Sequence, residues 1–77
     1  MNYRIYLKTP EMKNYGAISI SSGGIARTLI HAEMWTDIDI ASKAFDGLIR
    51  INPKSWQWQL RDVKQKVIRQ SGAITNE

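Results

Sequence analysis

The chain has 77 residues, of which 43% are hydrophobic and 23% are charged, and its formal net charge is +4 at neutral pH. This composition is ordinary for one small folded domain and argues against disorder throughout the chain. The absence of cysteine excludes disulfides and thiolate metal sites, and the absence of any run of about 18 apolar residues excludes a membrane-spanning helix.

The first predicted element is a strand over residues 3–8. Its side chains alternate along the chain, so successive residues point to opposite faces of a sheet. One face holds Tyr3, Ile5 and Leu7, and the other holds Arg4, Tyr6 and Lys8. Thr9-Pro10 ends the strand because proline has no N–H group to donate to a neighbouring strand.

Residues 17–35 give weaker signals. Residues 17–21 alternate again and predict a short strand, with a helical turn as the alternative. Ser22-Gly23-Gly24 predicts a turn. Residues 25–35 suit either a strand or a short helical turn, and we expect an extended path with a turn near residues 28–32.

Thr36-Asp37-Ile38-Asp39 predicts the start of a helix. Thr36 is a good N-cap residue, and an acidic residue three positions later can answer it in a capping box. Acidic residues also suit the positive N-terminal end of the helix dipole. We therefore interpret Asp37 and Asp39 as part of a helix start and not as a catalytic or metal-binding pair.

The predicted helix runs to about Ile51. Its buried stripe recurs at helical spacing and consists of Ile38, Ala41, Ala44, Phe45 and Leu48. Gly47 either weakens the last turns, by up to about 1 kcal/mol relative to alanine, or allows close approach to the sheet. Asn52-Pro53 ends the helix because the residue before proline is pushed out of the α region.

A closing strand follows the helix. Its apolar face holds Trp56, Trp58 and Leu60, and its polar face holds Gln57, Gln59 and Arg61. After Val63 the chain either extends this strand or starts a short helix, and we expect residues 71–77 to form a flexible C-terminal tail. The predicted fold is a single α+β domain over residues 1–70, with an antiparallel sheet of three to four strands and one helix packed on one face.

The positive charge is concentrated in the last third of the chain. Residues 50–69 hold six basic residues against the single acidic residue Asp62, whereas positive and negative charges balance over residues 1–49. A basic, aromatic stretch indicates an acidic partner. If the first and last strands are neighbours, their polar residues form an open face with three cations. The candidate binding residues are Arg4, Tyr6, Lys8, Lys54, Trp56, Gln57, Gln59, Arg61, Lys64, Lys66 and Arg69.

The sequence carries no recognisable catalytic, cofactor or metal signature. His31 is the only histidine, and Ser21 to Gly24 lacks the spacing of a phosphate-binding loop. We expect Trp58 to lie in the core, whereas Trp56 suits either the core or stacking on a base. We therefore expect a protein without catalytic residues, cofactor or metal.

The order of these signals resembles the very small α+β proteins of phages and mobile elements, some of which are anti-CRISPR proteins or other inhibitors of host machinery. The resemblance covers about residues 28–63. It lies in Ala32-Glu33-Met34-Trp35, the capped helix from Thr36 to Leu48, Asn52-Pro53, and the strand from Trp56 to Leu60. It implies a non-enzymatic phage-type protein that binds and inhibits a host macromolecular complex.

The expected partner is therefore a host protein or nucleoprotein complex in the cytoplasm of the host cell, with no membrane involved. The alternative is a small basic module that binds nucleic acid directly, and a small enzyme is the third reading. The basic aromatic stretch supports the alternative, although no recognition helix, zinc finger or RNA-binding motif is visible. The oligomeric state stays open.

Overall fold

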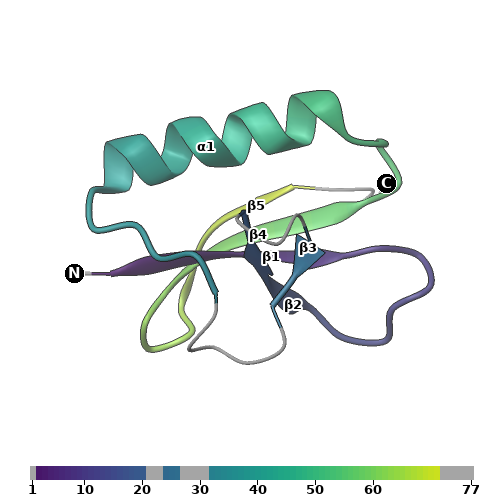
Figure 1. The fold of residues 1–77 in the computed structure, drawn as a ribbon, viewed down its shortest axis with the longest axis horizontal. Helices are drawn as coiled ribbons and strands as arrows, with labels where there is room; N and C mark the ends of the chain where they lie inside the picture. The colour runs from purple at the N-terminus through teal and green to yellow at the C-terminus, as the bar shows by residue number, and fades with distance from the viewer. Residues whose placement is uncertain (1, 21–23, 27–31, 72–77) are drawn as a thin grey trace.

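In the computed structural model, which describes residues 2–20, 24–26 and 32–71, one helix lies across one face of an antiparallel sheet (Figure 1). The described strands follow the spatial order β3-β2-β1-β4-β5, so β1 and β4 form the middle of the sheet. The elements are β1 (Tyr3–Lys8), β2 (Gly16–Ser19), β3 (Gly24–Ile25), α1 (Ile38–Ile51), β4 (Gln57–Asp62) and β5 (Val67–Ser71).

The predicted α+β class and the placement of one helix on one face are confirmed, but the predicted strand number is wrong. The sheet has five described strands instead of three to four. The two-residue β3 is too short to show any alternation in the sequence. Residues after Val63 form neither an extension of β4 nor a helix, because the chain reverses there and returns as β5.

The adjacency assumed for the first strand and the Trp56–Arg61 strand is correct, because β1 and β4 pair along their whole length. Their register places Arg4 opposite Arg61, Tyr6 opposite Gln59, and Lys8 opposite Gln57. Residues directly opposite each other in a sheet point to the same face. The polar residues of both strands therefore share one face, and their apolar residues share the other.

The core lies between α1 and the apolar face of the sheet. Its buried members are Ile5, Leu7, Ile18, Ala41, Phe45, Trp58 and Leu60, with Tyr3, Trp35, Ile38, Ala44, Leu48, Ile49 and Trp56 partly buried around them. The predicted helix stripe and the core position of Trp58 are thus confirmed. Burying each large apolar side chain contributes roughly 1.5–3 kcal/mol, so a domain of this size relies on nearly all of them.

Helix α1 begins one residue later than predicted. Asp37, not Thr36, is the N-cap, and its Oδ1 accepts hydrogen bonds from the backbone N–H groups of Asp39, at 2.8 Å, and Ile40, at 3.1 Å. Thr36 is exposed. Both residue types cap helices well, so the sequence alone does not separate them. Asp39 occupies the first turn, where its charge suits the helix dipole.

The predicted end of the helix is confirmed. Asn52 is the C-cap, and its side-chain Nδ2 donates to the carbonyl oxygen of Leu48 at 2.8 Å. A Cβ atom placed on Gly47 would meet no atom within 4 Å, so close approach to the sheet does not explain that glycine. Gly16 is the opposite case, because a Cβ there would lie 2.8 Å from Cγ2 of Ile25.

The segment before the helix is extended, as predicted, where the structure describes it. Trp35 forms a bridge with Tyr3 through two backbone hydrogen bonds of 2.7 and 2.9 Å. The predicted turn at 28–32 lies outside the described residues except for Ala32, and so does the predicted turn at 22–24 except for Gly24. Of the predicted tail, Ser71 belongs to β5 and residues 72–77 lie outside the described part.

Candidate binding face of the sheet

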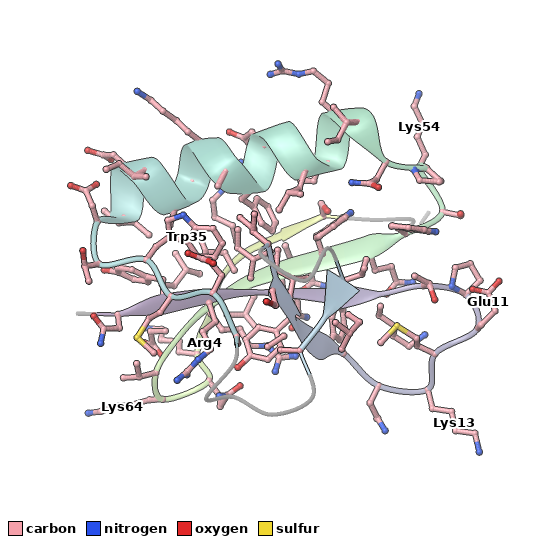
Figure 2. All side chains as sticks on the ribbon, in the orientation of Figure 1. Arg4, Glu11, Lys13, Trp35, Lys54 and Lys64 are labelled. Atoms are coloured by element: carbon pink, nitrogen blue, oxygen red, sulfur yellow. The ribbon has the colours of Figure 1, made fainter. Side chains whose placement is uncertain are left out.

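The side of the sheet that faces away from α1 gathers the polar residues of the two central strands. We call this surface the open face and define it by Arg4, Tyr6, Lys8, Gln57, Gln59 and Arg61. Figure 2 shows Arg4 and Lys64 on this side of the sheet, at the end where β1 begins, whereas Lys54 lies on the helix side at the other end. Six candidate residues predicted from sequence are therefore brought together as expected.

The open face is positively charged without compensation from within the sheet. Asp62 is the only acidic residue in the five described strands, and it lies opposite Tyr3 on the face that carries the helix. Arg4 and Arg61 are direct cross-strand neighbours. Like charges in directly opposite positions destabilise a sheet, so this pair lowers the stability of the unbound protein.

Arg61 is held in place by four neighbours. Its guanidinium carbon lies 4.2 Å from the ring centre of Tyr6 and 5.3 Å from that of Tyr15. Its Nε donates to Oε1 of Gln59 at 2.8 Å, and its Nη1 donates to Oε1 of Gln65 at 3.1 Å. Cation–π contacts and two side-chain hydrogen bonds thus fix the direction of the guanidinium plane.

The hairpin that joins β4 to β5 is closed by Asp62. Its Oδ1 accepts hydrogen bonds from the backbone N–H groups of Lys64 and Lys66, at 2.9 and 3.0 Å. Its backbone N–H donates to the carbonyl oxygen of Lys66 at 3.1 Å, and its carbonyl oxygen accepts from the N–H of Gln65 at 3.0 Å. The acidic residue of the basic stretch therefore shapes the turn that displays its two lysines.

Gln65 links this turn to the open face. It adopts a φ of 70°, the left-handed conformation that three-residue hairpin loops require at this position and that glycine usually fills. Its Nε2 donates to the hydroxyl of Tyr6 at 3.0 Å, while its Oε1 accepts from Arg61. One side chain thus fixes both the tyrosine and the arginine that lies over it.

The tyrosines of the open face are engaged with their neighbours. Tyr6 is only 4% exposed, since Arg61 covers its ring. The hydroxyl of Tyr15 donates to Oε1 of Gln57 at 3.2 Å. Burial raises the pKa of the Tyr15 hydroxyl above its ordinary value of 10.0, while the nearby Arg61 guanidinium opposes that rise. Tyr15 therefore stays a neutral hydrogen-bond donor at physiological pH.

The remaining candidate residues do not form one surface. Lys64 and Lys66 are exposed in the hairpin turn that joins β4 to β5. Arg69 lies on the helix side, where its Nη2 pairs with Oδ1 of Asp46 at 2.9 Å and its guanidinium lies 5.1 Å from the ring centre of Phe45. Trp56 packs at the edge of the core, with its ring centre 6.3 Å from that of Trp58.

An irregularity in β5 explains why Arg69 lies apart from Arg61. Arg69 is opposite Leu60, but Val67 is opposite Arg61, so Ile68 is an extra residue without a partner in β4. Such a β-bulge turns the residues on its two sides to different faces. Val67 therefore falls on the open face and Arg69 on the helix face.

Sequence reasoning missed Tyr15 and Gln65 as members of this site. The spacing of Asp62 and Lys64 was a usable signal for the turn, because an aspartate often accepts a hydrogen bond from the N–H two residues later. Because Asp62 lies opposite Tyr3, that turn would have placed Gln65 near the start of β1. Nothing in the sequence around Tyr15 indicates its contact with Gln57.

A concavity lies on the helix side of the sheet, between the C-terminal half of α1 and β2. It has a volume of about 220 Å³ and is lined by Leu7, Ile18, Ser19, Ile20, Gly24, Leu48, Asn52, Trp56 and Trp58. Its lining is almost wholly apolar and contains no titratable side chain, so it holds no general acid or base. Across the described residues, no group of three or more potential metal ligands comes together, and His31 lies outside them.

Comparison of the chain with protein-family models, with curated proteins and with solved structures finds no match. In the described part of the chain, no helix is long and apolar enough to cross a membrane.

Proposed function

We propose that this chain is a non-enzymatic binding protein of the phage-inhibitor type, which docks its open face and hairpin turn on an acidic surface of a host macromolecular complex. The observation that carries the proposal is the charge of the open face. Arg4, Lys8 and Arg61 point the same way from two paired strands, and none of the five described strands places an acidic residue beside them. The complex would be met in the host cytoplasm.

The state of the aromatic residues favours a protein partner over nucleic acid. Proteins that bind single strands offer exposed aromatic rings on which bases stack. Here the ring of Tyr6 is covered by Arg61, and Trp35, Trp56 and Trp58 pack on the helix side. The open face instead offers amides and arginines, which are common in the hydrogen-bonded parts of protein interfaces.

An interference assay tests the sharpest version of the proposal, an anti-CRISPR role. Cells that carry a CRISPR system and a targeted plasmid would express the wild-type chain or the Lys64→Glu/Lys66→Glu variant. The wild-type chain should rescue plasmid transformation, and the double variant should lose most of that rescue because both lysines lie in the hairpin turn that takes part in docking.

The matched control is Lys43→Glu/Lys54→Glu, which changes the net charge equally at two exposed lysines, one on α1 and one on the helix side of the sheet (Figure 2). The control should rescue transformation as well as the wild type does. If the wild-type chain fails to rescue transformation against every CRISPR type tested, the anti-CRISPR role is wrong. If both double variants fail equally, net charge matters and the open face does not.

Direct nucleic-acid binding is the alternative, and its salt dependence separates it from the proposal. Four phosphate contacts would give a log–log slope of affinity against salt of about −3 to −4. With a protein target, bare DNA or RNA should bind poorly at about 150 mM salt. Tight binding of the wild-type chain to bare nucleic acid at that salt, with the steep slope, would overturn the proposal in favour of the alternative.

A further inference from the structure

Three unfavourable local features meet at one corner of the open face. Arg4 and Arg61 stand directly opposite each other with like charges. The Nε of Arg4 is buried and has no hydrogen-bond partner. Gln65 holds a left-handed backbone conformation that side chains rarely adopt. Locally unfavourable charges, unpaired donors and backbone conformations that the rest of the fold tolerates are expected at functional sites.

The same corner presents unused hydrogen-bond donors in a fixed direction. A guanidinium carries five N–H donors. Arg61 uses one at Nε and one at Nη1, so three remain without a partner in the described part of the chain. Its plane is fixed by Tyr6 beneath it and by Gln59 and Gln65 at its edge. A fork whose orientation is already set loses little entropy when it binds a planar anion.

We propose that Arg4 and Arg61 form a binding site for one carboxylate, supplied by an aspartate or glutamate side chain of the protein partner. This inference rests on the proposed function and names the chemistry of its contact. The free edge of Arg61 would hold the two carboxylate oxygens, and Arg4 would add the second positive charge. Gln65 is a positioning residue, because it acts on the carboxylate only through Arg61.

The geometry fits a carboxylate better than a phosphate backbone. A nucleic acid is bound by a row of cations that tracks successive phosphates. In the two central strands, the open face has two arginines at one end and Lys8 beside Gln57 at the other, with Tyr6 and Gln59 between them. One concentrated pair of charges suits one anion, and the amides beside it suit the polar groups that surround a carboxylate in a protein.

A titration followed by NMR tests the site on the intact chain. The probe is a hexaglutamate peptide, and the second arm is a hexathymidylate of equal length. The Nε–H signal of Arg61 reports on the site directly. The peptide should shift this signal in a saturable way at low salt, and the oligonucleotide should shift it less at equal concentration.

Arg61→Lys keeps the charge and removes the fork, so it tests geometry apart from net charge. Peptide affinity should fall about 10-fold or more, as expected for the loss of a charge-assisted hydrogen bond. Arg50→Lys, at an exposed position on α1, is the matched control and should leave the affinity within about 2-fold.

Gln65→Gly tests the positioning role. It relieves the left-handed strain while removing the bonds to Tyr6 and Arg61, and we expect the melting temperature to stay within about 5 °C of the wild type. Peptide affinity should nevertheless fall about 3- to 10-fold, and the Arg61 Nε–H signal should move toward its position in a free arginine. If Gln65 served only to stabilise the fold, the Gln65→Gly variant would bind the peptide as tightly as the wild type at this unchanged melting temperature.

The carboxylate site is wrong if Arg61→Lys binds the peptide as tightly as the wild type, or if the peptide leaves the Arg61 signal unmoved. It is also wrong if hexathymidylate binds about 10-fold tighter than the peptide with the same shifts, since the ligand is then a phosphate backbone. Failure of the proposed function is distinguishable. If Lys64→Glu/Lys66→Glu abolishes rescue in cells while Arg61→Lys does not, docking through the hairpin turn stands and the carboxylate site falls.

Discussion

The two faces of the sheet are buried by different means. On the helix side, Ile5, Phe45 and Leu60 are at most 1% exposed because apolar side chains pack against one another. On the open face, Tyr6 and Gln59 are only 4% and 9% exposed, yet their neighbours are guanidinium and amide groups. Packing stabilises the first face in proportion to the area it buries, whereas directed bonds give the second face its shape.

The comparison predicts that the fold depends on the helix side for most of its stability. Phe45→Ala removes the aromatic ring at the centre of the core, and we expect a loss of about 3–5 kcal/mol in the free energy of unfolding. Urea denaturation followed by tryptophan fluorescence measures it, with the buried Trp58 as the reporter. Ile51→Ala, at a 77% exposed side chain, is the control and should cost less than about 0.5 kcal/mol. A loss below about 1 kcal/mol for Phe45→Ala would contradict the assigned core.

Asp62 connects the two faces, because it is buried on the helix side and also closes the turn that positions Gln65 on the open face. Its carboxylate is buried and accepts two backbone hydrogen bonds in the turn that carries Gln65. Asp62→Ala leaves two N–H donors unpaired, and we expect a loss of about 1–3 kcal/mol. Hydrogen exchange at the amides of Lys64 and Lys66 should accelerate in parallel. If stability fell but those amides stayed protected, the turn would be held by something other than this carboxylate.

Gly16 and Gly47 differ in how much space surrounds an added Cβ atom, so they test how tightly the helix side is packed. In Gly16→Ala the new Cβ would lie 2.8 Å from Cγ2 of Ile25 and 3.5 Å from Cε of Met12, so we expect a loss of about 1–3 kcal/mol. In Gly47→Ala the new methyl group meets nothing within 4 Å, and the helix should gain up to about 1 kcal/mol. Thermal melting of the two variants should therefore shift in opposite directions. Equal shifts would show that space around the Cβ does not decide the outcome.

The smallest effect is expected on the open face. Tyr6→Phe keeps the ring under Arg61 and removes only the hydroxyl that accepts from Gln65, which should cost about 0.5–1.5 kcal/mol. Tyr3→Phe is the matched control on the helix side, since the Tyr3 hydroxyl has no partner in the described part of the chain, and it should cost less. If Tyr6→Phe destabilised the protein as much as Phe45→Ala does, the open face would be a second core.

The sequence was most informative where one local rule acted alone. Alternation followed by Pro10 predicted β1 with the bounds that the structure has, and the apolar stripe predicted which residues of α1 are buried. The open face followed from the same alternation once β1 and β4 paired. The helix start was misplaced by one residue because Thr36 and Asp37 are equally good caps, and only the backbone path decides between them.

The arrangement at Arg61 was beyond the sequence because it is tertiary. Gln65 has no local preference for a φ of 70°, so its conformation is imposed by the hairpin between two long-range strand pairs. Its partners Tyr6 and Arg61 come from different strands, and Tyr15 comes from a connection without regular structure. The cations of the basic stretch likewise divide between the two faces of the sheet, because the sequence pattern does not reveal the bulge in β5.

That bulge makes the placement of charge depend on backbone irregularity as well as on residue type. Ile68 is the extra residue that lets Arg69 lie opposite Leu60 on the helix side while Val67 stays opposite Arg61. If Ile68 were deleted, Val67 and Arg69 would alternate regularly and Arg69 would keep its place on the helix side. If the strand were instead straightened at its present length, Arg69 would fall opposite Gln59 on the open face and would lose its ion pair with Asp46. The bulge therefore keeps one cation away from the open face without any change in formal charge.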